Sequence, residues 1–118
     1  MSEHLWIDNS LISKLENFLT GSEERVGFVL KNGDIVECLN ICTDPEQGFD
    51  VSDADLVRYC DEAVATWHTH PGATKQLSVG DYETFRVNDE LIHFIIGTDG
   101  VGAYQVEEGF VLNMDLPE

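Results

Sequence analysis

Two histidines separated by a single residue carry the strongest chemical signal in this sequence. His68 and His70 stand at the end of the apolar run Ala63–Trp67, which favours a buried strand. Side chains alternate across a strand, so the two imidazoles are expected to lie side by side on one face. Two neutral imidazoles at that spacing can bind one Zn²⁺ at ~2.0–2.1 Å each.

Asp81 is the candidate for the third protein ligand that a catalytic zinc site needs. Residues 71–77 give enough chain to turn back, so that the next helix presents its first turn to the end of the strand. Water at the remaining position could reach a pKa near ~7. The pair Ser78 and Asp81 also has a purely structural interpretation as a capping box, with Ser78 as N-cap. The two interpretations are compatible, because a capped helix start holds a ligand rigidly.

Taken together, these residues resemble the motif of the JAMM (MPN+) zinc metallopeptidases, which is a distant Glu followed by His-x-His-x₇-Ser-x-x-Asp. His68, His70, Ser78 and Asp81 occupy all four fixed positions of that motif. The resemblance covers nearly the whole chain, from the helix that precedes the distant Glu to the last strands.

Glu24 matches the distant Glu of the family. In the family this residue precedes a Gly of the first strand by three positions, and Glu24 stands in that relation to Gly27. Glu23 does not have this spacing, so Glu24 is preferred.

The resemblance implies a mechanism and a role for each residue. His68, His70 and Asp81 would ligate one catalytic zinc ion, with water as the fourth ligand. Glu24 would take the proton of that water and pass it to the leaving amine. Ser78 would donate a hydrogen bond to the developing oxyanion. The expected reaction is hydrolysis of a peptide or isopeptide bond in a protein or peptide substrate.

Length and local sequence narrow the substrate. A chain of 118 residues leaves little room for the insertions with which family members grip ubiquitin, so a eukaryotic deubiquitinase is not expected. The segment Leu77–Phe85 looks like JAMM domains of bacteriophage tail assembly proteins. This resemblance implies a role in phage tail assembly or at the tail tip, with tail proteins as partners.

Two alternatives stay open. The first is a bacterial JAMM peptidase that processes ubiquitin-like sulfur-carrier proteins at a diglycine terminus. Such a partner would need a basic or weakly acidic surface to approach a chain of net charge −17. The second is a non-catalytic MPN scaffold, which zinc content would distinguish because a degraded site holds no metal.

The elements expected around these residues indicate an α/β domain. Asp8–Ser10 can cap a helix over about Leu11–Leu19 that ends at Gly21, and Asn32-Gly33 favours a hairpin. The other elements expected are strands at Arg25–Leu30 and Ile35–Asn40, a short edge strand at Phe49–Val51, a helix from Ser52 to about Glu62, a central strand at Ala63–His68, a helix at Val79–Val87, and strands near Leu91–Ile96, Val101–Val106 and Phe110–Asn113. This order predicts a single domain over residues 1–118, with a mixed sheet flanked by helices. The resemblance implies the JAMM/MPN (cytidine-deaminase-like) architecture.

The composition excludes several function classes. Lys and Arg number 6 against 23 Asp and Glu, so neither nucleic acid nor an anionic membrane surface is an expected partner. No signal peptide is visible at the N-terminus, Met1–His4, and a cytoplasmic location is expected (host cytoplasm or virion tail for a phage protein). The cysteines are odd in number; Cys38 and Cys60 are expected to be buried, in a reducing compartment.

Two more side chains have structural interpretations. Trp67 is expected in the core or in a pocket wall. His93 stands in an apolar strand with no partner at ligand spacing, so it is expected to be a satisfied structural histidine.

Overall fold

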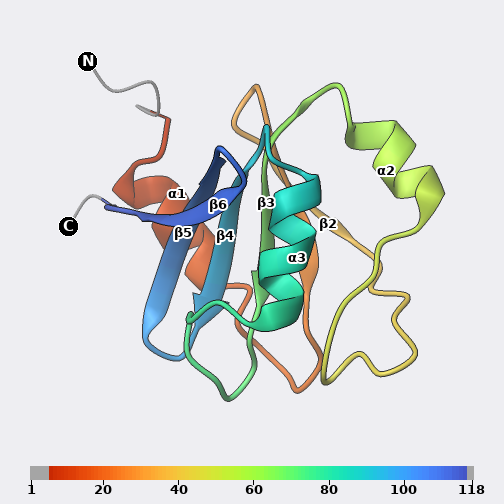
Figure 1. The fold of residues 1–118 in the computed structure, drawn as a ribbon. Coiled ribbons are helices and arrows are strands. Elements are labelled where there is room, and N and C mark those ends of the chain that lie inside the picture. Colours follow the sequence, from red (N-terminus) through yellow and green to blue (C-terminus); the bar gives the residue numbers. More distant parts are fainter. Residues whose placement is uncertain (1–5, 117–118) are drawn as a thin grey trace.

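Six strands form one mixed sheet in the order β2-β1-β3-β4-β5-β6 in the computed structural model, which describes residues 6–116 (Figure 1). The strands are joined with three helices into a small α/β domain. The elements are α1 (Asn9–Glu16), β1 (Val26–Leu30), β2 (Ile35–Cys38), α2 (Asp53–Tyr59), β3 (Ala63–Thr69), α3 (Val79–Val87), β4 (Ile92–Gly97), β5 (Gly100–Glu107) and β6 (Phe110–Met114). The expected order of helices and longer strands is confirmed.

One strand pair explains where α3 must lie. β3 and β4 are parallel, whereas every other neighbouring pair of the sheet is antiparallel. Parallel strands need a crossover connection, and α3 provides it. The crossover therefore begins where β3 ends, next to the two histidines.

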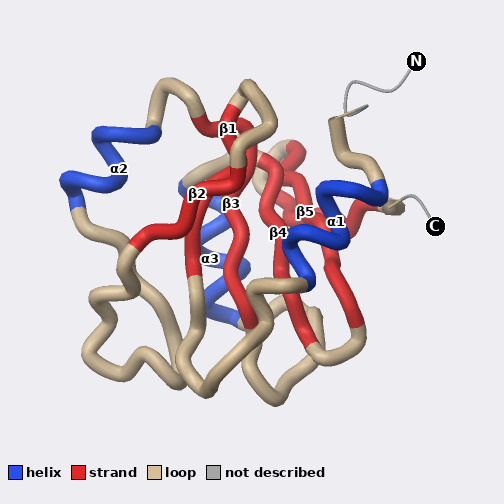
Figure 2. Tube along the Cα trace, turned by 180° about the vertical axis from the view of Figure 1, so that it is seen from behind, coloured by secondary structure: helices blue, strands red, loops and turns tan. Residues whose placement is uncertain are grey.

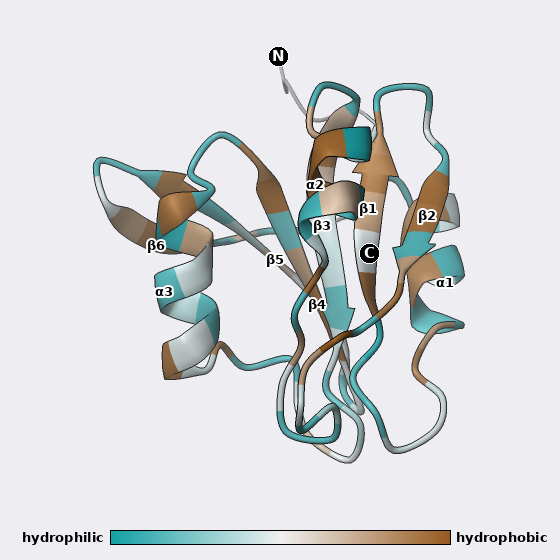
Figure 3. Ribbon diagram, turned by 90° about the vertical axis from the view of Figure 1, so that its right-hand side faces the viewer, coloured by the Kyte–Doolittle hydropathy of each residue, from teal (hydrophilic) through white to brown (hydrophobic). Residues whose placement is uncertain are grey.

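Helices cover both faces of the sheet. Figures 2 and 3 show α1 on one face and α3 on the other, with α2 beside β1 and β2 on the side of α3. The face toward α1 carries the larger apolar core, in which Leu15, Trp67 and Phe94 are fully buried. The face toward α3 is built around Phe85 and Ile95. The expected burial of Trp67 is confirmed.

Gly27 is required by this packing. A Cβ at Gly27 would lie 1.9 Å from the Val36 carbonyl oxygen and 2.8 Å from the indole of Trp67. The indole Nε1 donates to the same Val36 oxygen at 3.2 Å. The glycine that follows Glu24 by three residues thus has a local packing reason, independent of any catalytic role.

Three expectations about local structure are wrong. The first helix ends at Glu16 rather than near Gly21, since Asn17 is its C-cap and the chain then turns. Phe49–Val51 forms no strand, because Phe49 packs inward onto His68 instead of extending the sheet. Cys60 is exposed, since it caps the end of α2, a helix without a buried residue.

Among residues 6–116, no helix is long and apolar enough to cross a membrane. The segment Met1–His4, on which the signal-peptide argument relied, lies outside the described residues.

Candidate metal centre

The end of β3 brings the two histidines together. His68 pairs with Ile95 of β4, and the backbone N–H of His70 donates to the Ile96 carbonyl at 2.8 Å, so the sheet fixes both positions. The two Nε2 atoms lie 3.1 Å apart. The expectation that the rings lie side by side agrees with this geometry.

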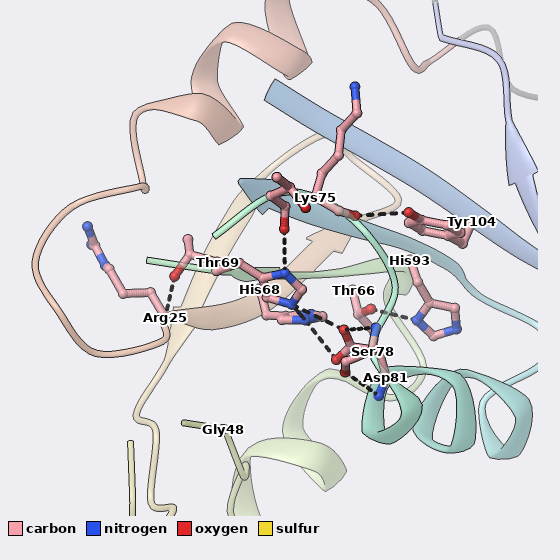
Figure 4. Close-up of polar contacts among 12 residues, drawn as sticks. Arg25, Gly48, Thr66, His68, Thr69, Lys75, Ser78, Asp81, His93 and Tyr104 are labelled. Carbon is pink, nitrogen blue, oxygen red and sulfur yellow. Dashed lines mark hydrogen bonds and ion pairs between the residues drawn. The ribbon is translucent and has the colours of Figure 1, made fainter. Parts of the chain in front are cut away.

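Asp81 reaches both rings from the first turn of α3. Its Oδ1 lies 3.0 Å from His68 Nε2 (Figure 4), and its Oδ2 lies 3.1 Å from His70 Nε2. The carboxylate is held there by a capping box, in which the Asp81 N–H donates to Ser78 Oγ and the Ser78 N–H donates to Asp81 Oδ2. The cap and the approach to the rings are therefore features of one conformation.

The Thr74 carbonyl decides which ring nitrogen of His70 is available. It lies 2.8 Å from His70 Nδ1, and a carbonyl can only accept, so Nδ1 carries a proton. In the neutral ring, Nε2 then presents a lone pair toward His68 and toward the Asp81 carboxylate. Converging lone pairs repel one another unless a cation, either a proton or a metal ion, lies between them.

The donor set fits zinc. Two imidazole nitrogens and a carboxylate are common zinc ligands. In a tetrahedral site with bonds of ~2.0–2.1 Å, ligand atoms are separated by roughly 3.3 Å. The contacts of 3.0–3.1 Å among the rings of His68 and His70 and the Asp81 carboxylate are close to that spacing.

Charge and burial at this cluster are opposed. Burial alone would raise the pKa of Asp81, but hydrogen bonds from His68 and His70 hold it well below its usual range. Burial lowers the pKa of His68. At His70 burial also acts to lower the pKa, yet the contacts with Asp81 and the Thr74 carbonyl leave it raised. Asp81 is therefore an anion, and the His70 ring beside it binds a proton more readily than a free histidine does.

Glu24 faces the same cluster from the chain just before β1. Its carboxylate and one nitrogen each of His68 and His70 lie within 4.8 Å of one another. Burial raises the pKa of Glu24 to about 7, opposed by His70 and reinforced by the charge of Asp81. The group is thus divided between its neutral and charged forms near neutral pH.

The backbone around Glu24 is fixed from two sides. The Glu24 N–H donates to the Pro45 carbonyl at 2.7 Å, and Asn40 Nδ2 donates to the Glu24 carbonyl at 2.8 Å. The next residue, Arg25, donates its N–H to Thr69 Oγ at 2.8 Å and accepts from the Thr69 N–H at 2.9 Å (Figure 4). Glu24 is therefore positioned against the strand that carries the histidines.

The segment 71–77 is tied to the turn between β4 and β5. The Thr98 N–H donates to the Ala73 carbonyl at 2.8 Å, the Lys75 N–H to Asp99 Oδ1 at 2.8 Å, and the Tyr104 hydroxyl to the Lys75 carbonyl at 2.9 Å. A Cβ at Gly97 would lie 2.2 Å from the backbone N of Lys75. The absence of a side chain at Gly97 lets this segment pack closely and places the Thr74 carbonyl on His70.

An open cleft of about 600 Å³ leads to the cluster. Its lining includes Glu24, Ser78 and Asp81, together with Glu46 and Phe49 of the loop before α2. The ring of Phe49 packs on His68 with 4.5 Å between centroids. A substrate in this cleft would therefore meet Glu24, His70, Ser78 and Asp81, whereas His68 is buried and does not line the cleft.

The structure brings together all five residues that the sequence predicts: Glu24, His68, His70, Ser78 and Asp81. Sequence reasoning missed the Thr74 carbonyl, Thr69, Gly97 and Phe49. The carbonyl leaves no trace in residue identity, and the others depend on contacts between distant segments.

Comparison with known proteins supports the fold only. The sequence matches no protein-family model and no curated protein. Its fold is similar to the solution structure of protein DSY2949 from Desulfitobacterium hafniense, with a TM-score of 0.70 and 12% sequence identity over 92% of this chain and 88% of that chain. At that identity, the likeness shows that the α/β arrangement of this domain occurs in another protein.

Proposed function

We propose that this protein is a zinc-dependent peptidase or isopeptidase of the JAMM type, holding one catalytic zinc. The observation that carries the proposal is the placement of the Asp81 carboxylate at 3.0 and 3.1 Å from the Nε2 atoms of His68 and His70. His68, His70 and Asp81 would hold the metal, because these three groups are closest to one another. Glu24 is the fourth group of the cluster and is left for proton transfer.

Bound zinc would supply a Lewis acid that lowers the pKa of water at the site. Glu24 would accept a proton from the attacking water and deliver it to the leaving nitrogen. In the metal-free protein, burial already raises the pKa of this carboxyl to about 7, so it binds a proton more readily than an exposed glutamate. Ser78 Oγ accepts from the Asp81 N–H, so its own hydroxyl proton is available to the carbonyl oxygen of the substrate.

The JAMM/MPN architecture is part of the proposal. It is supported by the position of the motif in the fold, with the histidines at the end of the parallel strand β3 and the aspartate in the first turn of the crossover helix α3. Phage tail assembly and the processing of sulfur-carrier proteins are the two settings that the sequence predicts for this chemistry.

A peptide-library digest tests the proposal. Zinc-loaded protein is incubated with a proteome-derived peptide library, and new termini are identified by mass spectrometry. New termini are expected with the wild type and should fall by on the order of 10²–10⁴ with Glu24→Gln, which removes the proton acceptor. Glu23→Gln is the matched control and should cleave like the wild type.

Zinc content is measured on the same samples. If Glu24→Gln retains zinc and loses cleavage, the two roles assigned to the carboxylates are supported. A wild type with one zinc per chain and no cleavage above the Glu24→Gln background would contradict the enzymatic proposal, and a wild type that holds no zinc would favour the scaffold alternative.

A further inference from the structure

A second cavity lies directly behind the candidate metal centre. It has a volume of about 230 Å³ and lies between α2 and α3 on the face of β1 and β3 toward α3. Phe49 and Thr84 line both this cavity and the cleft. The cavity therefore adjoins the place where a scissile bond would lie. Figure 3 shows α2 and α3 standing apart on this side of the sheet.

The walls of the cavity are mostly apolar, although Asp50, Thr84 and Asn88 also line it. Phe28 comes from β1, Leu56 from α2 and Phe85 from α3, and Leu91 directly precedes β4. A cavity of roughly 150 Å³ with aliphatic and aromatic walls is enough to hold a benzene molecule. The space behind His68 is therefore large enough for a branched aliphatic side chain.

The polar groups on the floor of the cavity are already paired. Thr66 Oγ lies 2.6 Å from His93 Nδ1, and His93 Nε2 donates to the Asn88 carbonyl at 2.9 Å. Since that carbonyl needs a donor, Nε2 carries the proton, Nδ1 accepts, and the Thr66 hydroxyl is used up as its donor. A polar side chain entering the cavity would lose its water and find no free hydrogen-bond donor on this floor, which costs free energy.

We propose that this cavity is a specificity pocket for a leucine-like aliphatic side chain next to the bond that is cleaved. The inference rests on the proposed function, since the metal centre defines where that bond lies. Phe49 stands at the boundary, since it packs on His68 and lines both the cleft and the pocket. Leu56 lines the pocket and would therefore determine specificity. Among the described residues, the structure shows no contact between Leu56 and the candidate metal ligands.

Binding of metal-chelating amino-acid hydroxamates tests the pocket in zinc-loaded protein. Glycine, leucine and asparagine hydroxamates share the chelating group and differ only in the side chain. Because burying a leucine side chain is worth on the order of a ten-fold change in affinity or more, leucine hydroxamate should bind at least about ten-fold tighter than the glycine compound. Asparagine hydroxamate should show no gain.

Two neighbouring substitutions on α2 separate the pocket from general effects. Leu56→Trp fills the cavity from its wall, so it should abolish the preference for leucine and leave the affinity for glycine hydroxamate unchanged. Val57→Trp is the matched control, because Val57 is 75% exposed and does not line the cavity. It should retain the full preference for leucine.

A titration of the metal-free protein tests the pocket independently of zinc binding. Isobutanol, which carries the leucine side chain, is titrated into metal-free protein and followed by amide and methyl chemical shifts. Shifts are expected at Leu91 and Phe85 in the wild type and in Val57→Trp, and should be lost in Leu56→Trp.

The two experiments fail differently. Isobutanol shifts at the pocket without zinc-dependent binding of any hydroxamate would sink the proposed function and leave the pocket in place. Zinc-dependent binding of all three hydroxamates with equal affinity, together with no isobutanol shifts at Leu91 and Phe85, would overturn the pocket and leave the metal centre in place.

Discussion

Two buried histidines, His68 and His93, both contact Phe85 but differ in the groups that surround their ring nitrogens. His68 and His93 are each 1% exposed and stand on the neighbouring strands β3 and β4. The ring of Phe85 stacks on His93 at 4.1 Å and contacts His68 at 6.1 Å between centroids. Both nitrogens of His93 are paired with neutral protein groups. His68 instead faces a second histidine and a carboxylate.

The difference shows that burial of a histidine does not identify its role. A ring whose two nitrogens meet one donor and one acceptor is complete as a neutral group, as at His93. At His70 the Nδ1–H donates to the Thr74 carbonyl, so Nε2 carries a lone pair that faces the lone pairs of its neighbours and requires a cation. What surrounds the second nitrogen distinguishes a structural histidine from a candidate ligand.

The largest expected effect is on zinc affinity, which should fall with substitutions at His70 and Asp81 but not with one at His93. His70→Ala and Asp81→Ala should each lower zinc affinity by more than the roughly 10–100-fold typical of an outer-shell partner, because each removes a ligand. His93→Gln should bind zinc like the wild type. Zinc per chain after dialysis against a weak chelator measures this, and equal retention by Asp81→Ala and the wild type would remove Asp81 from the ligand set.

Ser78 sharpens the contrast between holding a ligand and acting on a substrate. Ser78→Ala should bind zinc and cut the rate of cleavage by on the order of 10²–10³ if the hydroxyl stabilises the oxyanion. It should also lose about 1 kcal/mol of stability, since Ser78 is the N-cap of α3. Ser78→Gly tests the two effects separately. It should show the same loss of rate, but its loss of stability should be only about a few tenths of a kcal/mol.

The pH dependence of stability tests the region around His93. Burial lowers the pKa of His93 from 6.5 to about 4, so between these values the unfolded chain binds a proton that the folded protein does not. The stability of the metal-free protein should therefore fall as the pH drops from 6.5 toward 4, by up to about 3 kcal/mol from this residue.

Urea unfolding at several pH values measures this effect as the difference between the wild type and His93→Gln. The variant should lose this part of the pH dependence. An identical pH profile for both proteins would show that His93 does not contribute it.

A substitution at Gly97 tests whether the close packing of segment 71–77 supports zinc binding at His68, His70 and Asp81. In Gly97→Ala, the new Cβ would collide with backbone atoms of Thr74 and Lys75, so the carbonyl that orients His70 must move. Zinc affinity should fall by roughly 10–100-fold, as expected for loss of an outer-shell partner. Gly102→Ala, whose Cβ meets nothing closer than 3.4 Å, is the control and should bind zinc normally.

The sequence predicted the parts of this molecule that local rules determine. The alternation of β3, the Asn32-Gly33 turn and the Ser78 capping box act within a few residues, so their patterns survive in the sequence. The side-by-side rings of His68 and His70 follow from the same alternation.

The features that the sequence did not predict depend on contacts between distant segments. Phe49 looked like part of an edge strand, but a stacking contact with His68 holds it in the cleft wall. The role of Thr74 is carried by a backbone carbonyl, which every residue type has. The close approach at Gly97 appears only once β4 and the segment 71–77 are packed together.

X-ray absorption of the zinc-loaded protein tests the central claim most directly. The expected first shell is two nitrogen atoms at ~2.0–2.1 Å from His68 and His70, and two oxygen atoms at ~2.0–2.2 Å from Asp81 and water. Asp81→Ala should lose the aspartate oxygen. A sulfur shell at ~2.3 Å, or a shell made only of oxygen atoms, would contradict the assignment of the metal centre to these residues.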